Sequence, residues 1–411
     1  MRKQLLVILV LAIFIASCTK TDAPKTIAFI QDKPFIQDYS IKYNNENKDA
    51  NLQKVVSDRN GYIQILSDKG LLRLRAGQFL FPGTIVKDVQ DLPTSDKKIA
   101  GIGSYQNQLV YVDDKAVLSN AWAGKLFSRH EMPAARILAG GNDFIFLISD
   151  GKNLALLKDS QKLWEGSLAG KTITDIKFDT KNNLFWILTP ESISSFNPEN
   201  KDLKEVFTGS NLTCFEATDG KIIVGTTDGY FEMDAKTGKQ NGEIQRKMPW
   251  TELTSVAAVD GKIWFGSTWG AMRLNDDGKF SYYAGKRWIP SDTVIHISQG
   301  PDNSVLILTN AGLGQICFKE MTLHDKAMFF EKQVRERHIR TGFNGALGRM
   351  TDGDVTTGTL ENSDNDGLWT SMYLAAETFR YAVTKEEEAL QNVRESLDAM
   401  ERLYTINPLK S

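Results

Sequence analysis

Residues 262–274 read Lys262-Ile-Trp-Phe-Gly-Ser-Thr-Trp-Gly-Ala-Met-Arg-Leu274, two short apolar runs on either side of a turn. The first run predicts a strand over Ile263–Phe265, because it is short, rich in aromatic and β-branched residues, and bounded by turn residues. Thr268–Gly270 predicts the turn, and Ala271–Leu274 predicts the returning strand. The segment is therefore expected to form a β-hairpin.

The residues on both sides extend this hairpin into a sheet. Thr254–Ala258 predicts a strand that precedes the turn at Asp260-Gly261, and Phe280–Tyr283 predicts one that follows a second Asp-Gly turn. Asp-Gly pairs favour such turns because both residues tolerate a positive φ. The whole segment predicts four antiparallel strands.

The same pattern occurs seven times along the chain. Successive copies start roughly forty residues apart, which is the length of one four-stranded propeller blade. We therefore predict a mainly β fold, with a β-propeller of about seven blades over residues 51–320. The copies are Ile63–Gly70, Val110–Lys115, Ile145–Gly151, Phe185–Glu191, Ile222–Gly229, Ile263–Gly270 and Val305–Gly312.

Two further features fit this interpretation. Apolar runs such as Phe144–Ile148 lack clean alternation, because the inner strands of a propeller pack against neighbours on both faces. Four glycines fall at one equivalent turn position. We interpret them as residues that the turn requires because a side chain there would clash, and not as phosphate-binding residues. They are Gly70, Gly229, Gly270 and Gly312.

The last copy ends after three strands, at Phe318, since helix signals begin at Thr322. A propeller left in this state would expose a sheet edge. We predict that an N-terminal segment, either Thr26–Ile30 or Phe35–Tyr43, pairs into the last blade and closes the ring. Residues 19–50 are accordingly assigned to a tether and this closing strand.

The best copies carry a family resemblance. Lys262–Leu274, and Lys221-Ile-Ile-Val-Gly-Thr-Thr-Asp-Gly-Tyr-Phe231, resemble the two-component regulator propeller repeats that are common in envelope proteins of Bacteroidetes. In sensor proteins of that group such propellers precede a membrane helix and a histidine kinase, and often detect oligosaccharides. This sequence carries neither element, so the resemblance implies the fold over roughly residues 50–320 and not the ligand.

The N-terminus resembles a bacterial lipoprotein signal peptide. Arg2 and Lys3 supply positive charge, and Leu5–Ile15 is an apolar run too short to span a bilayer. Ile15-Ala16-Ser17-Cys18 resembles a lipobox, in which the cysteine receives the lipid. Residues 1–18 are thus expected to export the protein and Cys18 to anchor it in the bacterial cell envelope, facing the periplasm or the cell surface. An ordinary signal peptide with a chance cysteine is the alternative.

Composition narrows the function classes. The chain has 49 basic and 51 acidic residues, so no charge excess favours nucleic acid. There is no metal-binding spacing such as CxxC or HExxH, and no metal or cofactor is predicted. Apart from Cys18, only Cys214 and Cys317 remain; two buried thiols are favoured over a disulfide.

From residue 321 the apolar period changes from two to about 3.6 residues, which predicts helices to residue 411. Thr322 with Asp325, and Thr384 with Glu387, predict capped helix starts. The expected apolar faces are Leu323, Phe330, Val334 and His338 in the first helix; Leu368, Met372, Ala375, Phe379 and Val383 in the second; and a buried stripe of Leu390, Val393, Leu397, Met400 and Leu403 in the third.

Residues 364–381 are similar to the opening of an (α/α) toroid domain that follows such propellers in longer envelope proteins. Toroids of this shape are frequent among glycoside hydrolases and polysaccharide lyases, so the resemblance implies carbohydrate chemistry without placing a catalyst. The helical domain, 321–411, is expected to be incomplete.

A candidate ligand site lies on one face of the predicted ring, where loops from second to third strands and from one sheet to the next converge. Trp250, Trp269, Arg287 and Trp288 map there from neighbouring copies, and His130 lies in the matching loop between the second and third copies. Aromatic rings stack on sugars and a guanidinium binds carboxylates, so the cluster suits a neutral or acidic glycan. The alternative is that these tryptophans pack between blades or cover the helical domain.

The helical part offers weaker candidates. His338 is expected to be a hydrogen-bonded core residue, and either Asp364 or Asp366 is expected to cap the second helix. The other carboxylate, with Glu361, could serve acid–base chemistry, but the sequence defines no pair at glycosidase spacing.

Three function classes therefore stay open. The favoured one is a lipid-anchored envelope protein whose propeller face binds a glycan or a protein partner. The second is a carbohydrate-active hydrolase or lyase, and the third is a scaffold subunit of an envelope complex.

Overall fold

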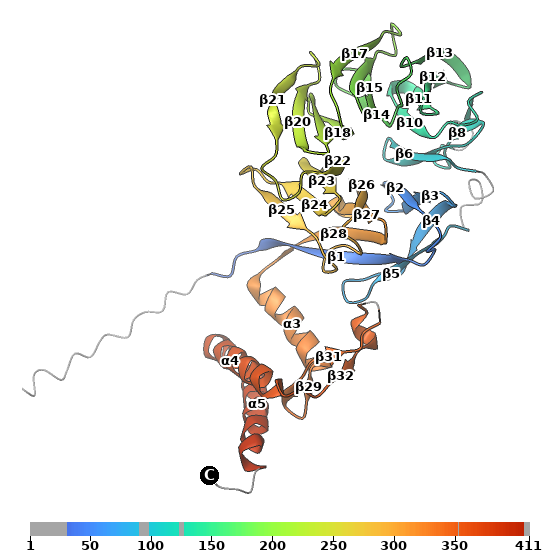
Figure 1. Cartoon of the computed structure of the whole chain (residues 1–411). Coiled ribbons are helices and arrows are strands. Elements are labelled where there is room, and N and C mark those ends of the chain that lie inside the picture. The colour runs from blue at the N-terminus through green and yellow to red at the C-terminus, as the bar shows by residue number, and fades with distance from the viewer. Residues whose placement is uncertain (1–30, 90–97, 123–126, 352, 407–411) are drawn as a thin grey trace, which may run out of the picture.

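The computed structural model describes residues 31–89, 98–122, 127–351 and 353–406. The predicted signal peptide with Cys18, and the closing segment Thr26–Ile30, lie outside the described residues. Figure 1 shows a ring of sheets, with the helices attached on the side where β1 and β28 lie.

Five sheets have four strands each, and their first strands lie around the middle of the ring (Figure 1). They are β6 (Gly101–Tyr105), β7 (Gln108–Val112), β8 (Ala116–Leu118) and β9 (Phe127–Arg129); β10 (Ile137–Gly140), β11 (Phe146–Ser149), β12 (Asn153–Lys158) and β13 (Gln161–Ser167); β14 (Asp175–Asp179), β15 (Leu184–Thr189), β16 (Ser192–Phe196) and β17 (Leu203–Thr208); β18 (Leu212–Thr218), β19 (Lys221–Thr226), β20 (Gly229–Asp234) and β21 (Gln240–Gln245); and β22 (Leu253–Val259), β23 (Lys262–Ser267), β24 (Gly270–Leu274) and β25 (Phe280–Tyr283).

The other propeller strands form one eight-stranded sheet in the order β2-β3-β4-β5-β1-β28-β27-β26. Their bounds are β1 (Phe35–Asn45), β2 (Leu52–Ser57), β3 (Ile63–Ser67), β4 (Gly70–Arg75), β5 (Gly83–Lys87), β26 (Val294–Gln299), β27 (Val305–Thr309) and β28 (Gly312–Met321). Each of the seven repeated segments supplies the second strand of its own set of strands: β3, β7, β11, β15, β19, β23 and β27.

The N-terminal strand β1 joins the two ends of the propeller. It pairs antiparallel with β28 from Phe35–Met321 to Asn44–Gly312, which is the pairing expected of the Phe35–Tyr43 stretch. Its last three residues also pair in parallel with β5. Because of this second contact, the first and last sheets are continuous. Where about seven separate blades are expected, the described residues form five separate four-stranded sheets and this one continuous sheet of eight strands.

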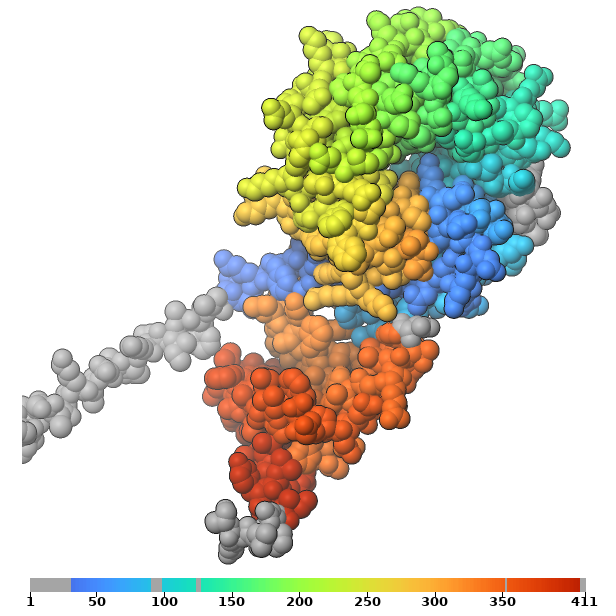
Figure 2. Space-filling view, in the orientation of Figure 1, coloured from blue at the N-terminus to red at the C-terminus, as the bar shows by residue number. Residues whose placement is uncertain are grey.

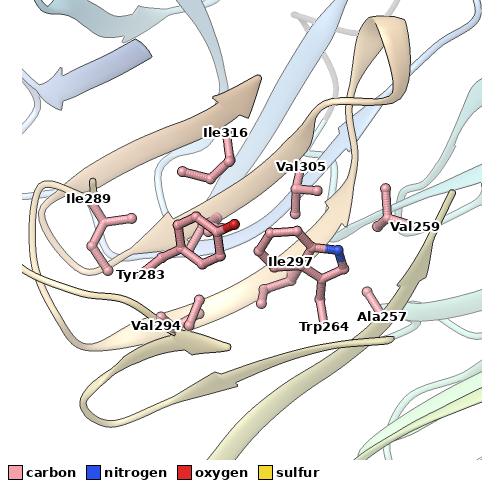
Figure 3. Close-up of a cluster of buried hydrophobic side chains, with 11 residues drawn as sticks. Ala257, Val259, Trp264, Tyr283, Ile289, Val294, Ile297, Val305 and Ile316 are labelled. Carbon is pink, nitrogen blue, oxygen red and sulfur yellow. The ribbon is translucent and has the colours of Figure 1, made fainter. Parts of the chain in front are cut away.

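Aliphatic and aromatic side chains fill the spaces between adjacent sheets. Figure 3 shows one such layer, where Trp264 and Tyr283 of one sheet face Ile297 and Ile316 of the next. Each of these four side chains is at most 2 % exposed. A fully buried Ile or Val contributes about 1.5–3 kcal/mol, so these layers hold the ring together.

At Gly229 the repeated glycine occupies a turn in which a larger side chain would clash. Gly229 has φ +108°, and a Cβ there would lie 2.2 Å from the carbonyl oxygen of Gln245. The surroundings of Gly229 therefore agree with the interpretation that the turn requires a glycine at this position.

Cys214 and Cys317 are both free thiols, the first buried and the second partly exposed. Burial raises the pKa of the Cys214 thiol to about 12. The chain therefore has no disulfide among the residues described.

The C-terminal part contains α3 (Leu323–Arg337), α4 (Asp366–Thr384) and α5 (Glu387–Thr405). The predicted cap of α3 is confirmed: the Thr322 side chain accepts from the backbone of Asp325, and the Asp325 carboxylate accepts from Thr322. Between α3 and α4 lie two small hairpins, β29 (Ile339–Arg340) with β30 (Phe343–Asn344) and β31 (Leu347–Gly348) with β32 (Thr359–Leu360). The short 3-10 helices are η1 (Asn142–Phe144), η2 (Pro301–Asn303) and η3 (Val355–Thr357).

Two predictions about α5 are wrong. Thr384 ends α4 and does not cap α5, whose N-cap is Glu386 without a side-chain hydrogen bond. The predicted buried stripe is also displaced around the helix: Leu397 and Leu403 are 46 % and 45 % exposed, and Leu390, Val393 and Met400 are only partly buried. The residues of α5 that are buried are Ala389, Asn392, Ser396 and Ala399.

The physical reason is that the helices meet through small and polar side chains. Asn392 Nδ2 donates to Glu331 Oε1 of α3 and to Glu377 Oε2 of α4, both at 2.9 Å. Alanines and serine allow the close approach that this network requires. The apolar residues are consequently turned outward, including Phe379 of α4, which is 73 % exposed.

Polar contacts and an aromatic contact attach α3 to the ring. The Asp32 carboxylate accepts hydrogen bonds from the backbone N–H groups of Leu323 and His324, each at 3.1 Å. Phe329 of α3 packs against Phe79, with ring centroids 5.6 Å apart. Figure 2 shows the helices extending from this side of the ring. No helix within the described ranges is both long and apolar enough to cross a membrane.

Candidate functional site

Trp250 and Trp269 come together on the surface, as expected from their loops. Trp250 lies between β21 and β22, and Trp269 lies in the turn between β23 and β24. Their ring centroids are 6.0 Å apart and their planes are inclined by 35°. The two residues are 41 % and 54 % exposed, respectively. They form an exposed pair of flat apolar rings, called here the tryptophan pair.

Hydrogen bonds hold the tryptophan pair in place. Trp250 Nε1 donates to Thr268 Oγ1 at 2.8 Å, and this hydroxyl donates to Glu252 Oε2 at 2.8 Å. The Tyr282 hydroxyl donates to the carbonyl oxygen of Trp269. A surface ring that is fixed before binding loses little conformational entropy when a ligand stacks on it. The pair is therefore a preorganised stacking surface.

Arg287 and Trp288 serve a different purpose from the tryptophan pair. Trp288 is partly buried, and its ring meets Tyr283 edge-on with a centroid separation of 5.0 Å. It also packs against the apolar layer drawn in Figure 3. The Arg287 guanidinium lies 5.1 Å from the centroid of the Trp288 ring and remains exposed. Trp288 thus fits the packing alternative, while Arg287 offers a surface cation.

His130 does not join the tryptophans. It follows β9 and lines a separate surface groove of about 1000 Å³ that β12 and β13 also border. Its Nδ1 accepts from the backbone N–H of Met132 at 3.2 Å, and its Nε2 is buried without a hydrogen-bond partner. Burial lowers the pKa of His130. His130 therefore lies apart from the tryptophans, because it follows the sheet β6–β9 whereas Trp269 belongs to the sheet β22–β25.

Sequence reasoning missed charged residues in the middle of the ring. Lys177 Nζ lies 3.1 Å from Glu216 Oε2 and 3.9 Å from Asp175 Oδ2, all on the first strands of neighbouring sheets. The opposing carboxylates raise the pKa of Lys177, outweighing its burial. The available signal was the presence of charged residues at first-strand positions where other copies carry small or apolar ones.

The polar groups of the helical part are satisfied by one another. Glu331 accepts from the Tyr373 hydroxyl at 2.7 Å, and Glu377 accepts from Arg380 at 3.1 Å. Burial raises the pKa of Glu331. Groups held in this way stabilise the contacts between helices.

The remaining helical candidates also have structural partners. His338 Nδ1 lies 3.0 Å from the carbonyl oxygen of Gly345, as expected of a hydrogen-bonded residue. Glu361 pairs with Arg349 at 3.0 Å, and Asp366 accepts from the backbone of Ser363. These contacts account for His338, Glu361 and Asp366 without catalysis.

No protein-family model matches the sequence, and no curated protein matches it. Solved structures do resemble it. A streptogramin B lyase structure has a TM-score of 0.54 and 16 % identity, covering 69 % of this chain and 98 % of that one. The extracellular domain of a putative one-component system from B. thetaiotaomicron has a TM-score of 0.51 and 17 % identity, covering 68 % of this chain and 39 % of that one. The WD40 β-propeller domain of Doa1 has a TM-score of 0.50 and 14 % identity, covering 69 % and 97 %.

These likenesses establish a β-propeller fold. At such identities they do not extend to a ligand or an activity. The chain spans 39 % of the B. thetaiotaomicron domain, whose further parts have no counterpart in the alignment.

Proposed function

We propose that this chain is an exported, lipid-anchored binding protein of the bacterial cell envelope whose propeller binds a glycan at the tryptophan pair. The observation that carries this proposal is the exposure of two adjacent, fixed indole rings, Trp250 and Trp269. The likeness of the fold to an extracellular domain from B. thetaiotaomicron supports the proposed location in the cell envelope.

The chemistry of the pair favours a sugar. Indole rings bury the C–H faces of a pyranose, and the polar rim at Glu252 and Thr268 lies within reach of its hydroxyl groups. We include Arg287 as a secondary contact for acidic glycans, because its guanidinium is exposed on an adjoining loop.

We infer that the ring counts as seven blades. The eight-stranded sheet divides into β2–β5 and β26–β28 with β1, two antiparallel sets of four joined by only three residue pairs. A ligand site formed by loops of successive sheets follows from this arrangement.

A glycan array with the soluble chain from Thr19 onward tests the proposal. We expect binding to at least one glycan, and a loss of roughly 1–3 kcal/mol of binding free energy for Trp269→Ala and for Trp250→Ala, as for other removed aromatic anchors. Trp369→Ala is the matched control, because Trp369 of α4 is 44 % exposed and lies outside the propeller. Absence of any glycan signal, or equal signals for all three variants, would remove the tryptophan pair as the site.

The anchor is tested separately. Metabolic labelling with palmitate should mark the full chain, and Cys18→Ala should abolish the label and release the protein into the soluble fraction, since stable anchoring requires more than one acyl chain. An unlabelled wild-type chain would contradict lipid anchoring, and the glycan proposal does not depend on this result.

A scaffold role is the second candidate function, and the outward apolar face of α4 favours it. Met372, Phe379 and Val383 are 58 %, 73 % and 71 % exposed. Light scattering after size exclusion should then show an oligomer that Phe379→Glu dissociates. A monomeric wild-type chain that captures no partner through this face would count against the scaffold.

A further inference from the structure

The middle of the ring contains a cavity of about 600 Å³. It is lined by the first strands of the sheets, β2, β6, β10, β14, β18, β22 and β26, which surround the ring centre in Figure 1. Its volume lies in the range of sites for small molecules, about 300–1000 Å³.

Three polar side chains of this cavity lack partners. Within the described part of the chain, the Lys54 ammonium has no hydrogen bond or ion pair, unlike Lys177. Nδ1 of His296 and Oγ of Ser298 are buried and also have no hydrogen-bond partner. Buried polar groups without partners cost free energy. Three of them in one cavity indicate that a ligand supplies the missing contacts.

The lining of the cavity carries two lysines, Lys54 and Lys177, and two carboxylates, Asp143 and Glu216, so its charges balance overall. Lys177 is already paired with Glu216 and lies near Asp175. Burial lowers the pKa of His296 well below its usual value, and Lys54 and Lys177 add to this effect, so His296 is neutral at pH 7. Lys54 is then the one lining lysine, among the described residues, without a counter-ion at hydrogen-bond distance. Burial lowers the pKa of its ammonium, and the Asp175 and Glu216 carboxylates oppose this shift.

We propose that the cavity binds a small monoanionic carboxylate, which pairs with Lys54 and receives hydrogen bonds from His296 and Ser298. The Lys54 ammonium without an ion pair offers one charge-assisted contact to a carboxylate. Because the lysines and carboxylates of the lining balance overall, a dianion such as sulfate would add more uncompensated charge than a monoanion. This ligand site goes beyond the proposed glycan site and does not depend on it.

The two sites lie toward opposite faces of the ring. The cavity is lined by Gln106, Asn142 and Thr180, which lie in or next to loops between first and second strands. Trp269 lies in a turn between second and third strands. In an antiparallel sheet these two kinds of connection occur at opposite ends of the strands.

Isothermal titration of the soluble chain with D-glucuronate tests this proposal, with D-glucose as the neutral analogue and sulfate as the dianion. We expect glucuronate to bind, glucose and sulfate to bind more weakly or not at all, and Lys54→Met to weaken glucuronate binding roughly ten- to a hundredfold, as for a lost hydrogen bond to a charged group. Lys332→Met on α3 is the control and should leave the affinity unchanged. No heat with glucuronate, tighter binding of sulfate, or an unchanged affinity for Lys54→Met would each overturn the proposal.

Circular dichroism checks that Lys54→Met is folded. If Lys54→Met is not folded, His296→Ala replaces it in the test, and its affinity for glucuronate should be about two- to tenfold weaker. An unchanged affinity of His296→Ala would overturn the proposal. Trp269→Ala should bind glucuronate normally, which separates failure of this site from failure of the glycan site.

Discussion

Gly70 and Gly229 occupy equivalent turns with nearly the same backbone angle, φ +109° and +108°, but their surroundings differ. A Cβ at Gly70 would meet no atom within 4 Å, whereas one at Gly229 would lie 2.2 Å from the Gln245 carbonyl oxygen. An alanine at Gly70 would therefore have backbone strain alone, whereas an alanine at Gly229 would have the same strain and a steric overlap.

We expect Gly70→Ala to lower the free energy of unfolding by about 1–2 kcal/mol, since only the positive φ is unfavourable. Gly229→Ala should cost about 1–3 kcal/mol more, because the backbone carbonyl must also move. Urea unfolding of both variants measures the difference. Equal losses would show that the turn near Gln245 relaxes freely.

A second prediction at this scale concerns the buried thiol of Cys214. Its pKa is about 12 in the folded protein, whereas an exposed thiol in the unfolded chain ionises near pH 8.5–9. Above that pH the unfolded chain releases a proton that the folded chain keeps, so the free energy of unfolding falls by up to about 1.4 kcal/mol per pH unit until pH 12. Cys214→Ala should make this decrease shallower, while Cys317 and Tyr230, whose pKa values burial also raises, still contribute to it. Urea unfolding of both proteins at neutral and alkaline pH tests it, and identical slopes would contradict it.

At the scale of elements, the repeats were predictable and the packing of the helices was not. The predicted strand Phe280–Tyr283 matches β25, and the predicted Ala271–Leu274 differs from β24 by one residue, because Asp-Gly turns and β-branched runs are local signals. For α5 the sequence pattern identifies an apolar stripe but not what lies against it. The network of Asn392 with Glu331 and Glu377 turns inward the neighbouring row of residues, each one position before a residue of the predicted stripe.

The closing strand β1 carries a prediction of its own. A chain that starts at residue 47 lacks β1, so the backbone groups of β28 that β1 covers become an open sheet edge. We expect it to unfold at a lower temperature and to aggregate, as measured by calorimetry and light scattering. A chain starting at residue 31 keeps β1 and is the control. Equal melting temperatures would mean that the ring is stable without its closing strand.

At the scale of the whole molecule, the site was partly predictable. Loop positions in the repeat brought Trp250 and Trp269 to one place, since equivalent loops of adjacent blades converge. The same rule assigns His130 to a matching loop but not to the neighbourhood of the tryptophans, because a loop position fixes a face of the ring and not a position around it. Lys54 of β2 and His296 of β26 both line the central cavity, although they belong to the first and last copies of the repeat. No local sequence pattern reveals such a contact.

The junction between ring and helices rests on few contacts, among them the Asp32 carboxylate at the start of α3. These hydrogen bonds lower the pKa of Asp32. We expect Asp32→Ala to increase hydrogen exchange at the Leu323 and His324 amides while protection in β22–β25 stays unchanged. Asp32→Asn should have a smaller effect, because the amide oxygen still accepts. Unchanged exchange would show that the Thr322 cap alone fixes α3.

The pairing of Phe35 with Met321 sets the order of events during biosynthesis. β1 emerges from the ribosome before every other propeller strand, yet its partner β28 is made last. Joining segments so distant in the chain is slow, and an unpaired strand is prone to wrong associations before its partner is made. The first strand must therefore stay unengaged until nearly the entire propeller has been synthesised.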